Sequence, residues 1–99
     1  MVKAKITMDN EKTREIKDCD LLVAIGLGVE EEKSQVQVSV IGGGLERAIV
    51  VQELANGMVE AINSLADNDS QAVRMLTAFR KAVENRCKAK LLERLTNGD

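Results

Sequence analysis

The sequence predicts an α+β fold in which a four-stranded antiparallel β-meander is followed by an αα-hairpin packed on one face of the sheet. Three observations lead to this prediction. Apolar and polar residues alternate over residues 2–8 and 34–41, an apolar run occupies residues 21–27, and the apolar period becomes helical from residue 45 onward. We therefore expect the element order ββββαα in a single domain over residues 1–99.

The first two strands are expected to form a hairpin. Residues 2–8 place an apolar side chain at every second position, which gives the strand one apolar face. Asp9 and Asn10 supply turn chemistry, because both side chains bond the local backbone and tolerate left-handed dihedrals. A short and mostly polar strand over residues 13–17 completes the hairpin, with Ile16 as its clearest inward residue.

The next two strands carry most of the apolar residues of the sheet. Residues 21–27 are apolar and bounded by turn residues, which is typical of a strand covered on both faces, so we place this strand in the middle of the sheet. A solvated loop is expected over residues 28–33. The fourth strand, residues 34–41, has polar but uncharged side chains on one face, and on the other it has three valines: Val36, Val38 and Val40.

The first helix is expected over residues 45–65, about six turns, after three glycines at 42–44 that end the fourth strand. Its apolar surface is wider than a single stripe, so the helix needs more than one covering surface. Gly57 lies inside it at a cost of roughly 1 kcal/mol relative to Ala, which predicts the close approach of another backbone.

The second helix is expected to run from about residue 70 to residue 95. The four residues 67–70 are all of N-cap type, and Asn97 with Gly98 supplies a stop. Its apolar positions are spaced by four beyond Val83, which rotates the stripe by about 40° at each step. The distal part of this helix should therefore face a different surface from its proximal part.

Composition excludes several classes of function. The 99 residues include no His, Trp or Tyr and a single Phe, and the net charge is −2. Without His, a zinc site is not expected at Cys19 or Cys87, and we expect both cysteines to be reduced and buried as small hydrophobic residues. A disulfide would require the fold to bring them together. The N-terminus has no continuous apolar segment, so we expect a cytoplasmic protein without a membrane span.

Catalytic and cofactor sites are not expected. The chain lacks His and Tyr, and no Ser or Cys lies in a nucleophile elbow. The glycines at 42–44 only superficially resemble a dinucleotide-binding turn, because Arg47 stands where the third glycine belongs. Acidic runs at 30–32 and 67–69 could hold a cation, but solvation and helix capping explain them. We predict a non-enzyme with no cofactor and no evident small-molecule substrate.

Charge is unevenly distributed along the chain. Residues 9–32 carry eight acids against three bases, and residues 74–94 carry seven bases against two acids. One interpretation is a small nucleic-acid-associated regulator that uses a basic helix: Arg80, Lys81, Arg86, Lys88 and Lys90. The net negative charge, and the absence of a common face for these bases, favour a solvated helix whose bases pair with the acidic loops, within a subunit or across a dimer.

Surplus apolar surface on the first helix is the strongest signal in the sequence. A small domain hides such surface most simply by self-association, and two-fold dimers are the commonest solution. We therefore predict a non-enzymatic interaction or structural protein that forms a homodimer. The residues expected at the contact are Val51, Ala55, Met58 and Ile62.

Overall fold

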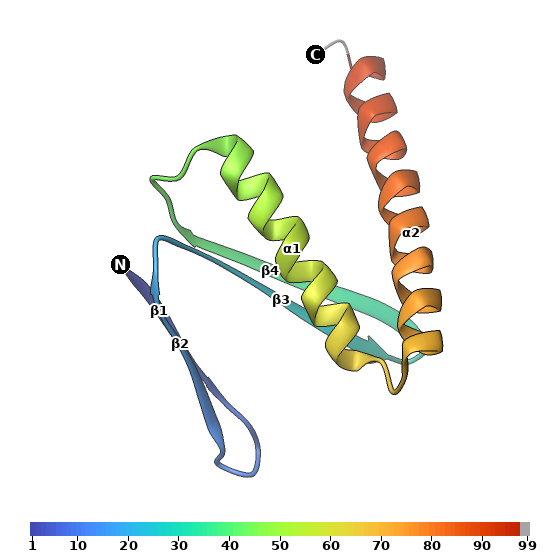
Figure 1. Cartoon of the computed structure of the whole chain (residues 1–99). Coiled ribbons are helices and arrows are strands. Elements are labelled where there is room, and N and C mark those ends of the chain that lie inside the picture. Colours follow the sequence, from blue (N-terminus) through green and yellow to red (C-terminus); the bar gives the residue numbers. More distant parts are fainter. Residues whose placement is uncertain (98–99) are drawn as a thin grey trace. The chain divides into compact units, whose positions relative to one another are not determined.

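The computed structural model describes residues 1–97, and its elements follow the predicted order (Figure 1). The α+β class and the order ββββαα are confirmed. The elements are β1 (Val2–Thr7), β2 (Thr13–Cys19), β3 (Leu21–Glu30), β4 (Lys33–Gly42), α1 (Arg47–Leu65) and α2 (Asp69–Thr96).

The chain divides into two compact units, and each is described by itself. The first covers residues 1–50 and holds all four strands, and the second starts at Val51 and holds most of α1 and all of α2. The predictions of a single domain and of helices packed on a sheet face concern both units together, and they stay predictions.

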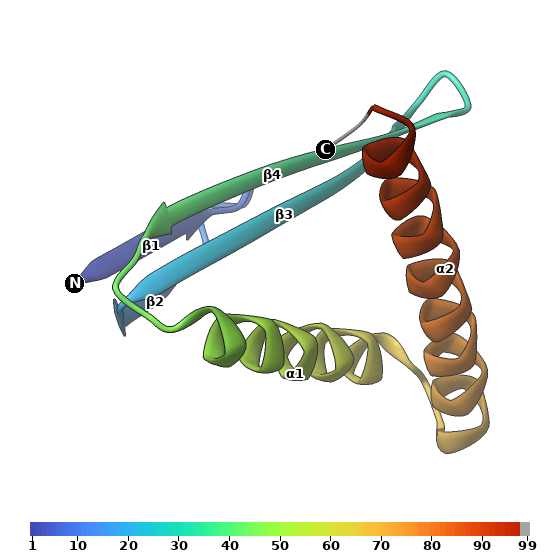
Figure 2. The ribbon, with the colours of Figure 1, turned by 90° about the horizontal axis from the view of Figure 1, so that it is seen from above.

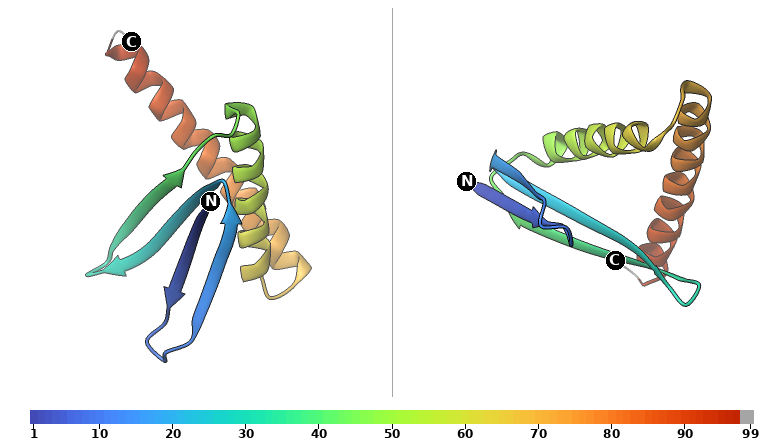
Figure 3. Two further views of the ribbon diagram at one scale, coloured as in Figure 1. Left: turned by 90° about the vertical axis from the view of Figure 1, so that its left-hand side faces the viewer. Right: turned by 90° about the horizontal axis from the view of Figure 1, so that it is seen from below.

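The four strands pair as two antiparallel ribbons, β1 with β2 and β3 with β4, rather than as one continuous meander. β3 is thus paired on one side only, and the expectation that it lies in the middle of a sheet is wrong. The physical reason is the connection: Asp20 alone joins β2 to β3, whereas a hairpin needs a loop of at least two residues. The two ribbons diverge from this corner (Figure 3).

The corner is closed by the end of β4. The Gly43 N–H donates to the carbonyl oxygen of Asp20 at 3.1 Å. Gly42 has a φ of 104°, and a Cβ built on it would overlap that same carbonyl and lie 2.8 Å from Cγ2 of Val2. Only glycine fits this position. As expected of the glycine run, the chain then turns from strand to helix, with Gly44 also at a positive φ of 85°.

The β1–β2 ribbon has the predicted turn and one irregularity. The Met8 N–H donates to the Lys12 carbonyl at 2.8 Å, and the Asn10 Oδ1 accepts from the Lys12 N–H at 3.2 Å. The register shifts between the pairs that Val2 and Ala4 make, so β2 has one extra residue there. Asp18, at a φ of 62°, lies in this bulge.

The β3–β4 ribbon is longer than expected. Its register is unbroken from Leu21 opposite Gly42 to Glu30 opposite Lys33. The strands lie side by side up to a turn of two residues (Figure 2). The loop expected over residues 28–33 is therefore wrong. Glu31 and Glu32 make the turn alone, with φ values of 50° and 66°.

Replacing this turn by Asn-Gly should stabilise the protein. Two-residue hairpin turns with positive φ at both positions favour Asn-Gly, because other residues cost roughly 1 kcal/mol each in that region. We expect the double variant Glu31→Asn with Glu32→Gly to raise the free energy of unfolding by about 1–2 kcal/mol in urea titrations. The control, Glu11→Asn in the other turn at a φ of 66°, should gain only about half as much. No gain in the double variant would contradict the turn geometry.

The helix boundaries follow local capping chemistry. The Asn68 side chain accepts the Gln71 N–H at 2.8 Å, while the Gln71 side chain accepts the Asp67 N–H. The Asn68 cap confirms the predicted start of the second helix within the cluster 67–70. At the other end, the Asn97 N–H donates to the Glu93 carbonyl at 3.1 Å. Gly98, the other half of the predicted stop, lies outside the described residues.

Candidate self-association surface

Most side chains of the chain are exposed. Leu22 is the one buried residue among residues 1–97. The chain of 10.8 kDa has an accessible surface of 9005 Å². Two compact proteins of half that mass would together expose roughly 6,700 Å² by the usual scaling of surface with mass. The chain thus exposes about 2,300 Å² more than two separate compact units would, and we call this difference the surplus surface.

The β3–β4 ribbon contributes a continuous apolar face. Residues directly opposite each other on paired strands share a face, and the register therefore puts eight apolar side chains together: Leu21, Val23, Ile25, Leu27, Val29, Val36, Val38 and Val40. We call this set the apolar ribbon face. Leu27 is 79% exposed and Val38 is 57% exposed.

The opposite face of the same ribbon has Leu22 opposite Ile41 at one end and Glu30 opposite Lys33 at the other, and it is small and polar between them. It pairs Ala24 with Ser39, Gly26 with Gln37, and Gly28 with Gln35. These side chains are compatible with water, whereas those of the apolar ribbon face are not. The middle of the ribbon is therefore amphipathic, and the apolar ribbon face is the one that needs a cover.

The four predicted contact residues of α1 share one stripe. At 100° per residue, Val51, Ala55, Met58 and Ile62 fall within about 60° of each other around the helix axis. Val51 is 68% exposed, Ala55 is also exposed, and Met58 and Ile62 are half-buried. Whether the stripe contacts a second copy stays a prediction.

Gly57 of α1 does not have the neighbour that was expected. Within the described part of the chain, no atom outside the helix's own backbone and adjacent residues lies within 4 Å of a Cβ built on it. The close approach of another backbone is therefore not found within this unit, and it stays a prediction for other partners of α1.

Half-buried side chains of the helical unit gather at the end of α1 and the beginning of α2: Met58, Ile62, Ala66, Gln71, Ala72, Met75, Leu76 and Phe79. Beyond Phe79, every residue from 80 to 97 is exposed. Leu91, Leu92 and Leu95 are each at least 61% exposed. The prediction that the distal part of α2 faces a different surface stays a prediction, because this part is exposed on all sides.

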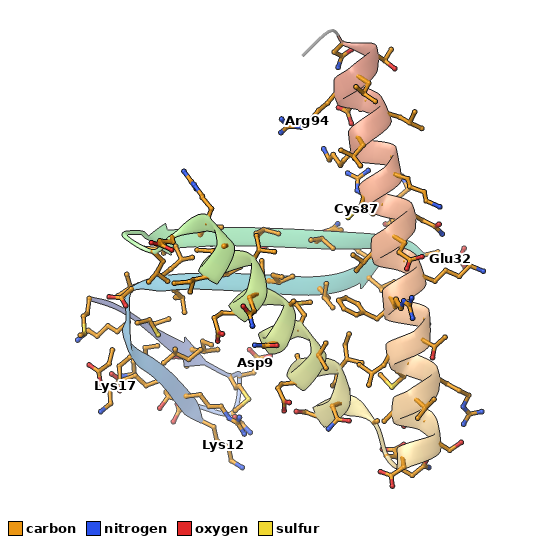
Figure 4. The ribbon with its side chains drawn as sticks, turned by 45° about the horizontal axis from the view of Figure 1, so that its top comes forward. Asp9, Lys12, Lys17, Glu32, Cys87 and Arg94 are labelled. Atoms are coloured by element: carbon orange, nitrogen blue, oxygen red, sulfur yellow. The ribbon has the colours of Figure 1, made fainter. Side chains whose placement is uncertain are left out.

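The five candidate nucleic-acid contacts lie in this exposed half of α2, which also carries Arg94 (Figure 4). Arg80 pairs with Glu84 at 3.3 Å, and Lys90 pairs with Glu93 at 3.8 Å. The other three are Lys81, Arg86 and Lys88. At 100° per residue the five bases spread around the helix. This arrangement favours solvation and pairing along the helix over a single phosphate-binding face.

Both cysteines are free thiols, with Cys19 half-buried and Cys87 exposed. The expectation that both are buried is therefore wrong for Cys87, which lies on the exposed half of α2 (Figure 4). The reason is its place along α2, because the half-buried residues end at Phe79 and the residues beyond it are exposed on all sides of the helix.

Residues 1–97 contain no group of three or more acidic or cysteine side chains that could hold a metal ion. Over the same residues, neither helix combines the length and the apolar character needed to cross a membrane. Comparisons of the chain with family models, with curated proteins and with solved structures found no match. The exposed apolar surface is thus the feature on which a function can be argued.

The apolar stripe of α1 is predicted by the sequence, whereas the apolar ribbon face is not predicted as an exposed surface. The alternation of Val36, Val38 and Val40 was recognised, but β3 was expected to be covered on both sides. The missing signal was the register, which aligns Ile25 with Val38 and Leu27 with Val36. Such an alignment could have been derived from the sequence had the two-residue turn been recognised.

Proposed function

We propose that the protein is a non-enzymatic interaction or structural module that acts as a homodimer. The observation that supports this most directly is the surplus of accessible surface, about 2,300 Å² per chain. Obligate dimers bury roughly 1,000–2,500 Å² on each copy, so one partner of the same size would account for the surplus. A second copy presents the same surface, and a two-fold axis brings like patches together.

Energetics also support this proposal. Full burial of a Val, Leu or Ile side chain stabilises by about 1.5–3 kcal/mol. Six members of the apolar ribbon face are between 42% and 79% exposed, which corresponds to about 8 kcal/mol per copy if a partner covers them. Two copies would gain about twice that amount, which offsets the estimated 4–15 kcal/mol cost of association.

Light scattering after size exclusion tests the proposal. At micromolar concentration we expect a mass of about twice 10.8 kDa. Because unfolding would be coupled to dissociation, a tenfold rise in protein concentration should also stabilise the protein by about 1.4 kcal/mol in urea titrations. A mass of one chain with unfolding independent of concentration would rule the proposal out.

A further inference from the structure

We infer that two copies join along the free edge of β4, antiparallel across a two-fold axis at Gln37, and so form one four-stranded sheet in the order β3-β4-β4-β3. This inference rests on the proposed self-association and specifies the element that carries it. The edge and the register are formed by residues of the first unit alone.

The outer edge of β4 is an exposed strand edge without the features that usually protect one. Among residues 1–97, β4 pairs with β3 alone, and all ten of its own residues are exposed. In contrast, β3 contacts β1, and Leu21, Leu22 and Val23 at its start are half-buried or buried. Exposed edges are usually protected by charges, proline or bulges. After Lys33, β4 has no charged residue and no proline, and its register with β3 is unbroken.

The backbone groups that point to this edge can be identified from the turn. A two-residue turn is closed by a hydrogen-bonded pair, here Glu30 and Lys33, and pair types alternate along an antiparallel ladder. The N–H and C=O groups that point away from β3 therefore belong to four residues: Ser34, Val36, Val38 and Val40. A second strand would bond these groups and leave the β3–β4 ladder intact.

The pattern of β4 is self-complementary in one register. An axis at Gln37 places Val36 opposite Val38 of the partner subunit, so the apolar faces of the two ribbons continue into each other. It pairs residues 33–41 and leaves out Gly42, whose φ of 104° departs from strand geometry. A full overlap of residues 33–42 would instead place Val36 opposite Ser39 of the partner subunit and mix apolar with polar side chains.

The surplus surface favours a second copy over a foreign strand. A single foreign peptide strand would bond the free backbone groups of β4. It would not bring a second apolar face to extend the apolar ribbon face. Pairing with a second copy joins the two apolar ribbon faces into one continuous surface. The apolar stripes of α1 from the two chains can then cover this surface. The unaccounted surface of about 2,300 Å² per chain is on the scale of an obligate interface between such copies.

Disulfide trapping tests the register. In a background with Cys19→Ser and Cys87→Ser, the variant Gln37→Cys places two thiols opposite each other at a pair without hydrogen bonds, where Cα atoms are about 4.5–5.5 Å apart and a disulfide can form. Gln35→Cys is the control, because the two Cys would lie about 13 Å apart along the strands. Under mild oxidation we expect most Gln37→Cys chains to be cross-linked, and at least tenfold fewer Gln35→Cys chains.

The outcomes separate this inference from the proposed function. If the mass stays that of a dimer but Gln37→Cys does not cross-link, or cross-links no better than Gln35→Cys, the inference is overturned and the homodimer stands. If the protein is a monomer, both are overturned, and a foreign partner for β4 becomes the remaining use of the edge.

Amide hydrogen exchange of the unmodified protein gives a second test that needs no variant. In the paired edge, the amides of Val36, Val38 and Val40 should exchange at least about tenfold more slowly at a concentration where the mass is that of a dimer than after dilution. The amides of Gln35 and Gln37 are bonded within the ribbon and serve as internal controls. Fast exchange of the three valines in the dimer would overturn the inference.

Discussion

Replacing Val51 by Glu is expected to weaken the homodimer about a thousandfold. Val51 lies on the predicted contact stripe of α1 and is 68% exposed, so its replacement costs little within a single chain. In a two-fold interface, the substitution occurs twice, and each copy would lose apolar burial and desolvate a carboxylate at about 2 kcal/mol. The combined loss of about 4 kcal/mol corresponds to three orders of magnitude in the dissociation constant.

The matched control for this variant is Gln52→Glu. Gln52 is the next residue of α1, is also exposed, and lies toward the polar side of the helix. The same carboxylate there should change the dissociation constant by no more than about twofold, as is usual for exposed surface positions. Sedimentation equilibrium over a range of concentrations measures both constants. Equal constants for the two variants would remove the stripe Val51, Ala55, Met58 and Ile62 from the interface.

Gly42→Ala should destabilise the protein by about 3 kcal/mol. The residue has a φ of 104°, and its Cβ would overlap the Asp20 carbonyl and approach Val2. Both the strained backbone and the overlap act on the corner where the two ribbons meet, and neither can relax without moving backbone atoms. Urea unfolding at a fixed protein concentration measures the loss, because unfolding would be coupled to dissociation.

Gly43→Ala is the control at the adjacent position. A Cβ on Gly43 meets no atom within 4 Å, so the substitution should change the free energy of unfolding by less than about 0.5 kcal/mol. A similar loss in both variants would mean that glycine is needed for the general flexibility of the loop rather than for the contact at Gly42.

The sequence predicted the type and order of the elements because each carries its own local signal. Alternation identified the strands over residues 2–8 and 34–41, and the helical period with the cap at Asn68 identified α2. The turn was missed because Glu31 and Glu32 are residues that rarely occupy positive φ at both positions of a turn. The division into two ribbons was missed because it depends on the single residue Asp20 between β2 and β3.

The candidate surface was predicted in part. Periodicity is enough to place Val51 and Ala55 on one stripe, because helix geometry relates positions to directions. Exposure is not a local property, so the sequence could not tell that Cys87 is exposed. That outcome depends on which surfaces meet, which is decided by tertiary and quaternary packing.

The two-residue turn at Glu31 and Glu32 also bears on how the protein assembles. Contacts in the β3–β4 hairpin join residues close in sequence, and such hairpins zip within about 1–10 μs. The encounter of two chains is slower and depends on concentration. A newly made chain would thus carry a formed ribbon with an exposed apolar face before it meets its counterpart, and we expect refolding from denaturant to lose more material to aggregates as the protein concentration is raised.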